Sequence, residues 1–378
     1  MHYLLFALLI VTLSGCNEIN LSGTISGLTS NGLVLGNGNE TVSPLANANS
    51  FIFPSQLKAG DSYNVFVKAQ PTGLFCSVSK GWGTIVKTAI SDVTVTCVVA
   101  PSNGVSVTIT SPVDGASVSG NTLNVTGTFM GPLNTGITVN GIVAAQDSNR
   151  FYAQVPLASG SNALTITATT PAGNTATQTV NLTSTGSSPF QVSANPGSGI
   201  APLLASFTIQ NNTLNAMTRI EADFNGDGVI DLTTNDPATP MQFTYASPGV
   251  YQSSFKVTDS QNNITSLSYL VVVQDHAQLD QLLKTQWSGM SNALVSGNKA
   301  QALSHMTLQA QTKYEPVFDA LLPNMPAIIQ TFSSPTTSQL SASLGEYAVK
   351  RNRADGQVNM YLIYFLVDPD GVWKLDSM

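Results

Sequence analysis

The chain has 378 residues, of which only 9% are charged, and its 14 basic and 21 acidic side chains give a formal net charge of −7. This balance argues against nucleic acid as a partner, because nucleic-acid binding needs clustered Lys and Arg to displace counterions. Hydrophobic residues make up 42% of the chain, which is enough to build the cores of several domains and is not the composition of a disordered protein.

The first sixteen residues predict export followed by lipid attachment. Residues 4–13 form an apolar run of signal-peptide length that is too short to span a bilayer. The next residues, Leu13-Ser14-Gly15-Cys16, resemble the lipobox of bacterial lipoproteins. That resemblance implies that residues 1–15 are a signal peptide and that Cys16 carries acyl chains, which would be its contact with the membrane. The alternative is an ordinary signal peptide with an incidental cysteine.

Residues 16–100 are predicted to form a small β module. Apolar and polar residues alternate in short runs, including 63–68 and 93–97, and Gly and Asn separate the runs. The stretch 70–83 resembles a small β module of bacterial exported lipoproteins, and this resemblance implies no particular chemistry.

Two cysteines, Cys76 and Cys97, remain once Cys16 is lipidated. An exported chain passes through an oxidising compartment, and an even number of remaining cysteines favours pairing. We therefore predict one structural disulfide between Cys76 and Cys97.

Residues 101–185 are predicted to form a β-sandwich. Strand-like runs recur at a spacing of about 8–12 residues, at 105–110, 123–128, 151–157 and 164–169. Asn140-Gly141 predicts a hairpin, because this pair accepts the positive φ angles of a type I′ turn. The segment 109–115, together with Val139-Asn140-Gly141, resembles the immunoglobulin-like domain B of bacterial glucodextranases. This implies an accessory sandwich and associates the chain only weakly with carbohydrate.

Residues 186–275 carry the most specific set of fold motifs. Gly199-Ile200-Ala201-Pro202-Leu203, Asp223-Phe224, Pro248-Gly249-Val250-Tyr251 and Val257-Thr258-Asp259 follow one another in the order seen in polycystic-kidney-disease (PKD) repeats. The module resembles that family of extracellular β-sandwiches. Ala222 stands where the family usually has an aromatic residue.

The same module contains a candidate metal site. Side-chain oxygens at Asp223, Asn225, Asp227 and Asp231, together with the Val229 carbonyl, occupy the ligand offsets of a calcium loop. The bidentate glutamate of an EF-hand is absent, because Thr234 stands at its position. We predict a structural calcium ion as the cofactor, and the alternative is an acidic turn without metal.

Residues 276–378 change from β patterning to an α+β arrangement. Leu279, Leu282, Leu283, Met290 and Leu294 recur at helical spacing, two further helical stretches follow, and strands are predicted at 346–351, 358–367 and 372–376. Trp287, Met290, Lys313-Tyr314 and the ending 371–375 resemble the nuclear-transport-factor-like, or SnoaL-like, cone fold.

One strand of this last domain is apolar on both faces. In Met360-Tyr361-Leu362-Ile363-Tyr364-Phe365, one face is expected to pack on helices and the other to line a cavity or a partner surface. His305, in a predicted helix, is the candidate residue for a ligand pocket there, although a lone helical histidine is more often packed or solvated.

The predicted fold class is mainly β: tandem immunoglobulin-like sandwich modules followed by a C-terminal α+β cone-like domain. We expect a non-catalytic protein of the bacterial cell envelope, anchored in the outer membrane through Cys16. It would act as a binding, adhesion or display stalk whose modules make few contacts, with an envelope glycan or a surface protein as partner. One alternative is an accessory carbohydrate-binding lipoprotein that uses exposed aromatics such as Trp82. The other is a small-ligand binder or enzyme that uses the C-terminal cavity.

Overall fold

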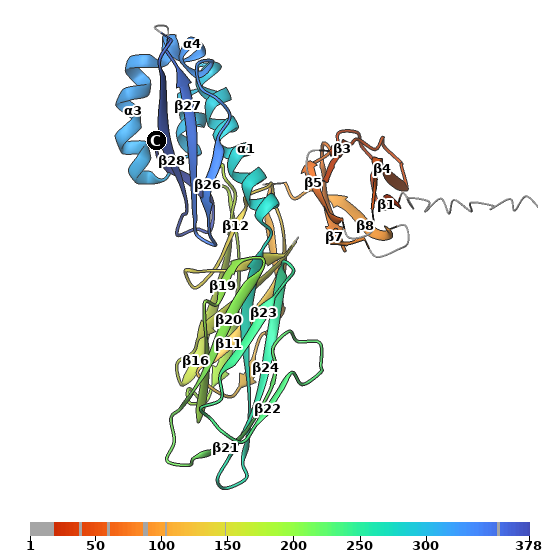
Figure 1. Ribbon diagram of the computed structural model, residues 1–378, viewed down its shortest axis with the longest axis vertical. Helices are drawn as coiled ribbons and strands as arrows, with labels where there is room; N and C mark the ends of the chain where they lie inside the picture. The colour runs from red at the N-terminus through yellow and green to blue at the C-terminus, as the bar shows by residue number, and fades with distance from the viewer. Residues whose placement is uncertain are drawn as a thin grey trace, which may run out of the picture. The chain divides into compact units, whose positions relative to one another are not determined.

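The computed structural model describes residues 19–37, 40–58, 61–85, 90–102, 104–147, 149–353 and 356–378. The chain divides into two compact units, Met1–Val99 and Ala100–Met378 (Figure 1). The predicted signal peptide and Cys16 lie outside the described residues.

The first unit is a sandwich of two four-stranded sheets with the strand orders β4-β1-β8-β6 and β3-β2-β5-β7. Alternation along β1 points Ile19, Leu21 and Ile25 into a core shared by the two sheets and leaves the intervening residues more exposed. The strands are β1 (Ile19–Ser26), β2 (Val34–Asn37), β3 (Glu40–Val42), β4 (Ser50–Leu57), β5 (Ser62–Ala69), β6 (Leu74–Ser79), β7 (Trp82–Thr84) and β8 (Ile90–Val99).

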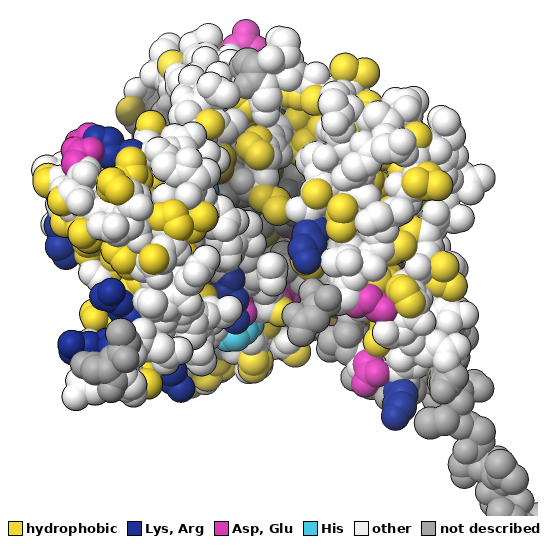
Figure 2. Space-filling model, turned by 90° about the horizontal axis from the view of Figure 1, so that it is seen from above, with side chains coloured by type: hydrophobic (Ala, Val, Ile, Leu, Met, Phe, Trp, Pro, Cys, Tyr) yellow, Lys and Arg dark blue, Asp and Glu magenta, His cyan; other side chains and the backbone are white. Residues whose placement is uncertain are grey.

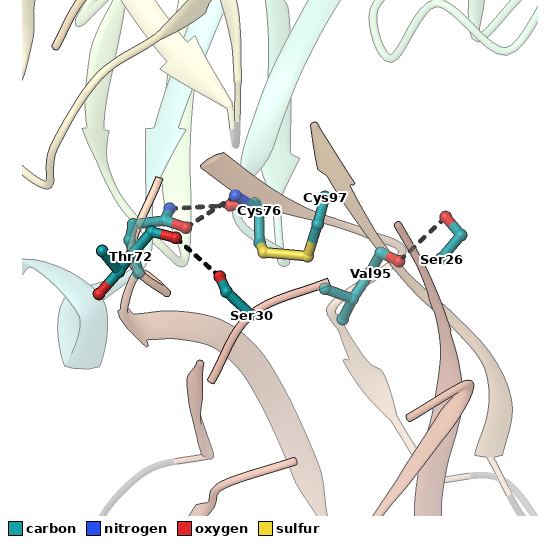
Figure 3. Close-up of a disulfide and its surroundings, with 7 residues drawn as sticks. Ser26, Ser30, Thr72, Cys76, Val95 and Cys97 are labelled. Carbon is teal, nitrogen blue, oxygen red and sulfur yellow. Dashed lines mark hydrogen bonds between the residues drawn. A yellow bond between two sulfur atoms is a disulfide. The ribbon is translucent and has the colours of Figure 1, made fainter. Parts of the chain in front are cut away.

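The predicted disulfide is confirmed, because Cys76 of β6 and Cys97 of β8 lie opposite each other in the ladder and are bonded (Figure 3). Both cysteines are buried. Gln70 donates to the Cys76 carbonyl (2.9 Å) and accepts from its amide (2.7 Å). With a sequence separation of 21 between the two cysteines, the bond stabilises this unit by about 3 kcal/mol in the chain-entropy treatment.

The second unit begins with a sandwich whose sheets have the orders β10-β17-β16-β12-β13 and β14-β15-β11-β9. Asn140 (φ 48°) and Gly141 (φ 81°) form the predicted turn between β12 and β13. The strands are β9 (Ser106–Ser111), β10 (Ala116–Val118), β11 (Thr122–Met130), β12 (Gly136–Val139), β13 (Ile142–Val143), β14 (Ala145–Asp147), β15 (Arg150–Pro156), β16 (Gly160–Thr169) and β17 (Thr175–Ser184).

The next sandwich pairs the sheets β18-β20-β23 and β19-β25-β24-β21-β22. Its core is aromatic, with the Phe207 ring centroid 5.1 Å from that of Phe224 and 5.3 Å from that of Phe255. Ala222 is fully buried in this core. The strands are β18 (Phe190–Asn195), β19 (Ser198–Ile200), β20 (Leu203–Asn211), β21 (Met217–Asp223), β22 (Leu232–Thr234), β23 (Met241–Tyr245), β24 (Gly249–Asp259) and β25 (Ile264–Gln274).

The C-terminal part is an antiparallel sheet, β26-β27-β28-β29, packed against helices. Asp275 caps the first helix by accepting from the Gln278 amide (2.9 Å), and Gly297 (φ 75°) follows its end. The sequence predicted the first three helices and three of the strands, but it missed the short helix Met325–Ile329 and the strand Thr336–Leu340. The elements are α1 (His276–Val295), α2 (Lys299–Ser304), α3 (Leu308–Leu321), a 3₁₀ turn (Leu322–Asn324), α4 (Met325–Ile329), β26 (Thr336–Leu340), β27 (Leu344–Asn352), β28 (Val358–Val367) and β29 (Trp373–Ser377).

The mainly β fold class with a C-terminal α+β part is confirmed, but the expectation of few contacts between modules is wrong for residues 100–378. Side chains of Asn124 and Gln154 donate to Ser268 of β25 (3.0 and 3.1 Å), which joins the two sandwiches. Asn134 accepts from the Trp373 amide (2.8 Å) and donates to the Trp373 carbonyl (2.8 Å), which joins the first of these sandwiches to β29.

Asp259 organises the turn between β24 and β25. Its carboxylate accepts from the amides of Gln261 (2.9 Å) and Asn263 (2.8 Å) and from the side chains of Asn263 (3.0 Å) and Asn215 (2.9 Å). These donors favour the ionised form, and the Asn263 side chain contributes most to lowering the pKa of Asp259 to about 2.

We expect Asp259 to make the stability of this sandwich depend on pH. Because its folded-state pKa lies below the ordinary value of about 4, its contribution is complete above pH ~4 and is lost as the pH falls toward 2. Asp259→Asn should lower the calorimetric melting temperature at pH 7, and the difference from the parent chain should shrink below pH ~4. Asp236→Asn is the control, since that carboxylate accepts one backbone hydrogen bond, from Ala238. A pH-independent difference for Asp259→Asn would contradict the prediction.

Candidate functional site

The acidic loop between β21 and β22 is the first candidate site. Asp223, at the end of β21, is 4% exposed. Its two carboxylate oxygens accept from the amides of Gly226 (2.7 Å) and Gly228 (2.9 Å). Both glycines have positive φ angles, 75° and 87°, which turn their amides toward Asp223. The buried Asp223 carboxylate therefore fixes the backbone of the loop by accepting both of these amides.

The other predicted ligands also bond to the loop itself. Asn225 accepts from the Asp227 amide (3.1 Å) and donates to the Asp227 carboxylate (2.9 Å), and Asp227 accepts from the Val229 amide (2.8 Å). Asp231 accepts from the Phe224 amide (2.7 Å). Each acidic side chain of the loop thus has at least one hydrogen-bond donor within it.

Two hydroxyl groups anchor the loop to the sandwich beneath it. Tyr245 and Ser253 both donate to the Phe224 carbonyl, at 2.8 and 2.6 Å. Burial is the main cause that raises the pKa of Tyr245, to about 12, so the phenol stays protonated and able to donate. The carbonyl next to Asp223 is therefore held in place by buried groups.

The hydrogen bonds within the loop use the same oxygens that would bind calcium. Asn225 turns its amide group toward Asp227, and calcium would have to compete with that hydrogen bond for the carboxylate. Across the part of the chain that the structure describes, no group of three or more His, Cys, Asp or Glu is arranged to hold a metal ion. The loop is closed by hydrogen bonds in this arrangement, and calcium binding stays a prediction.

His305, the second candidate, lies at the C-terminal end of α2 and packs against α1. Its Nδ1 lies 2.8 Å from Oε1 of Gln286, a buried residue. A Cβ on Gly289 would lie 2.6 Å from the His305 ring, so the ring occupies space that only glycine leaves open. Burial lowers the pKa of His305. The side chain is thus part of the packing between helices.

A polar network in the same domain was not found from the sequence. Asp280 of α1 accepts from Lys284 (2.7 Å), from Tyr347 (3.1 Å) and from Thr337. Burial works to raise the pKa of Asp280, but these hydrogen bonds outweigh it and leave the pKa below its usual value. The network ties α1 to β26 and β27. Helical and strand periodicity give no sign that Thr337 and Tyr347 join it, because these residues lie 57 and 67 positions from Asp280 in the sequence.

The remaining predicted residues do not gather into one site. The Trp82 side chain lies outside the described part of the structure, like Cys16. On the face seen in Figure 2, charged side chains occupy a small area, and most of the surface is uncharged. Among the described residues, no helix has the length and apolar character needed to cross a bilayer.

Comparison with known protein families supports the predicted resemblance of one module. Residues 105–185 match the family of glucodextranase domain B. This covers the sandwich for which the sequence motifs indicated that resemblance. No curated protein matches the chain.

Solved structures with similar parts include the fibronectin(III)-like modules of Clostridium thermocellum CbhA, 16% identical over 46% of this chain and 96% of that one, with a TM-score of 0.19. The PKD domain of human SorCS2 is 21% identical over 24% of this chain and 75% of that one, with a TM-score of 0.21. SGBP-B of the Bacteroides ovatus mixed-linkage glucan utilization locus, solved with a mixed-linkage heptasaccharide, is 12% identical over 68% of this chain and 64% of that one, with a TM-score of 0.16. Similarity at this level says nothing about what the chain binds.

We expect Asp223→Asn to destabilise the full chain by about 2 kcal/mol in the presence of a chelator, because one of two hydrogen bonds to a buried charge loses its acceptor. Chemical denaturation measures the change. Asp114→Asn is the control, since Asp114 accepts a single amide, that of Asn181.

The same measurement tests the calcium prediction. That prediction requires millimolar calcium to raise the melting temperature of the parent chain and to leave Asp223→Asn unchanged. Equal melting temperatures with calcium and with chelator would contradict it.

Proposed function

We propose that the chain is a non-catalytic lipoprotein of the bacterial cell envelope, anchored through Cys16, that presents its C-terminal α+β domain for binding to another envelope component. The established part is modular: immunoglobulin-like sandwiches precede an α+β domain. The anchoring, the compartment and the binding role are our proposal.

The observation that carries the proposal is the fixed attachment of the C-terminal domain. β25 continues into α1 with Asp275 as the single residue between them. Ile200 of β19 packs against the C-terminal core. At Gly136 a Cβ would lie 2.2 Å from the Asp370 carbonyl, so backbone meets backbone there. Such contacts suit a platform that holds a binding surface in one orientation. The sequence had instead suggested a stalk whose modules make few contacts with one another.

A role in polysaccharide capture is the second candidate. It is supported by the match of residues 105–185 to a domain of glucodextranases, whose name refers to a glucan. Under this alternative the first sandwich of residues 100–378 would contact a glycan while the C-terminal domain stays mounted on it.

Asn134→Ala tests the platform. The substitution leaves the Trp373 amide without its acceptor, at a cost of about 1–3 kcal/mol. We expect faster amide hydrogen exchange in segments 134–137 and 371–375, measured by mass spectrometry on the full chain. Asn162→Ala is the control, because it removes hydrogen bonds made within the same sandwich. Unchanged exchange at 371–375 in Asn134→Ala would show that this contact does not hold the domain.

Cys16→Ser tests the anchor. In a bacterial host fed an alkyne-tagged fatty acid, we expect the parent chain to carry the label and to sediment with membranes, and the variant to lose both properties. Asn17→Asp is the matched control, because it changes the residue next to the cysteine and keeps the predicted acylation site. An unlabelled parent chain, or a labelled Cys16→Ser variant, would contradict lipidation at this cysteine.

A further inference from the structure

Arg351 lies at the end of β27, on the side of the sheet that faces the helices. Along this strand Tyr347, Val349 and Arg351 alternate with more exposed residues and therefore share one face. Tyr347 and Val349 are buried in the domain core, and Arg351 is partly buried at the end of the same row. This end of the hairpin of β27 and β28 lies beside α4 (Figure 1). A guanidinium group thus takes the last position of a row of core residues.

Two neighbours hold the guanidinium of Arg351 in one position. Its carbon atom Cζ lies 5.5 Å from the ring centroid of Phe332, which pairs with Arg351 in an isolated antiparallel bridge. Its Nε donates to the Thr331 hydroxyl (3.2 Å). A cation over an aromatic ring is attracted by the electrons of the ring face. The plane of the guanidinium is therefore oriented before any ligand binds, which lowers the entropy cost of binding.

A third neighbour, Tyr361, places a hydroxyl beside this group. The side chain of Asn359 donates to that hydroxyl (3.3 Å) and is the main cause that lowers the pKa of Tyr361, and Arg351 and Arg353 lower it further. Tyr361 is 36% exposed. Two guanidinium groups thus act on one phenol at the solvent-facing end of the domain, where positive potential is concentrated.

Arg351 differs from other cations of the domain in having no carboxylate partner. Lys284, Lys299 and Lys374 each form an ion pair, at 2.7, 2.6 and 2.6 Å. None of the ion pairs between residues that the structure describes includes Arg351. The guanidinium has five N–H donors in a planar fork, and this fork matches the two oxygens of a carboxylate or a phosphate. An external anion would supply the missing counter-charge.

We propose that Arg351 is the centre of a site for an oxyanion carried by a glycan, either a carboxylate or a phosphate ester. The inference rests on the proposed binding role of the C-terminal domain and names the chemistry of its partner. Uncharged polar side chains flank the cation: Thr331 bonds to it, Asn352 follows it in sequence, and Asn359 lies opposite it in the ladder. Their hydroxyl and amide groups suit the hydroxyls of a sugar.

The surroundings of Arg351 favour a glycan over an anionic bilayer. Binding to a bilayer surface is strong when apolar side chains beside the cations enter the headgroup region. The exposed apolar residues nearest to the hairpin end, Val358 and Met360, alternate with Asn359 and Tyr361 along β28. They therefore point to the opposite face of the sheet. The face that carries Arg351 presents amides and hydroxyls instead.

Isothermal titration calorimetry of the disulfide-bonded chain 17–378 with short oligosaccharides tests the proposal. The probes are oligogalacturonate for the carboxylate, a phosphorylated mannan fragment for the phosphate, and the methyl ester of oligogalacturonate as a matched neutral ligand. We expect one or both acidic probes to bind, with an affinity that falls as the salt concentration rises. The methyl ester should not bind, and the chain should not sediment with vesicles that contain phosphatidylglycerol.

Variants of Arg351 assign the binding to this site. Arg351→Gln should weaken the acidic oligosaccharide about tenfold or more, because a charge-assisted contact is lost. Arg351→Lys keeps the charge without the planar fork and should recover only part of the affinity. Arg219→Gln is the matched control, since Arg219 lies in the preceding sandwich and pairs with Glu221 (2.7 Å). Melting temperatures show whether each variant is folded.

Four results would overturn the site: no binding of either acidic probe, equal binding of the methyl ester, binding to vesicles without binding to oligosaccharides, or a folded Arg351→Gln variant with the parent affinity. These results are independent of lipid attachment, because the chain 17–378 lacks Cys16. A chain that binds the acidic probe here but carries no lipid in the Cys16→Ser experiment would support the site and contradict only the anchoring.

Discussion

The reciprocal pair of hydrogen bonds between Asn134 and the main chain of Trp373 is the contact on which the arrangement of residues 100–378 depends. β-Sandwiches in series are ordinarily separate cores joined by linkers, with relative motion as the default. Here a side chain satisfies both main-chain groups of one residue in another domain. Leaving these two main-chain groups unpaired costs free energy. Separating the sandwich from the C-terminal domain is therefore unfavourable, and this penalty does not require a large apolar interface.

A second general feature of the structure is that its carboxylates accept hydrogen bonds from nearby groups of the protein. With few charges to use, the chain closes its irregular segments with carboxylates aimed at backbone amides, as at Asp223 and Asp259. Asp280 plays a comparable part by joining a helix to two strands. Hydrogen bonds to carboxylates are stronger than those between neutral groups, so these side chains fix their segments firmly.

The sequence allowed correct prediction of what depends on local chemistry. The Asn140-Gly141 turn follows from its tolerance of positive φ, and the disulfide follows from the number of cysteines and from the compartment that the sequence predicts. The Asn134–Trp373 contact could not be predicted, because its partners are 239 positions apart in the sequence and no motif relates one to the other. In the acidic loop the sequence indicated which side chains carry oxygens that can accept hydrogen bonds. It could not indicate which backbone amides they would accept from, since that depends on the local backbone geometry.

The direct passage from β25 into α1 has a mechanical consequence. β25 lies inside its sheet, between β19 and β24, and is hydrogen-bonded along its length to β24. A tensile force applied to the C-terminal domain is transmitted along β25 and loads its ladder in shear, so that many hydrogen bonds resist it together. The junction between this sandwich and the C-terminal domain should therefore resist extension along the chain.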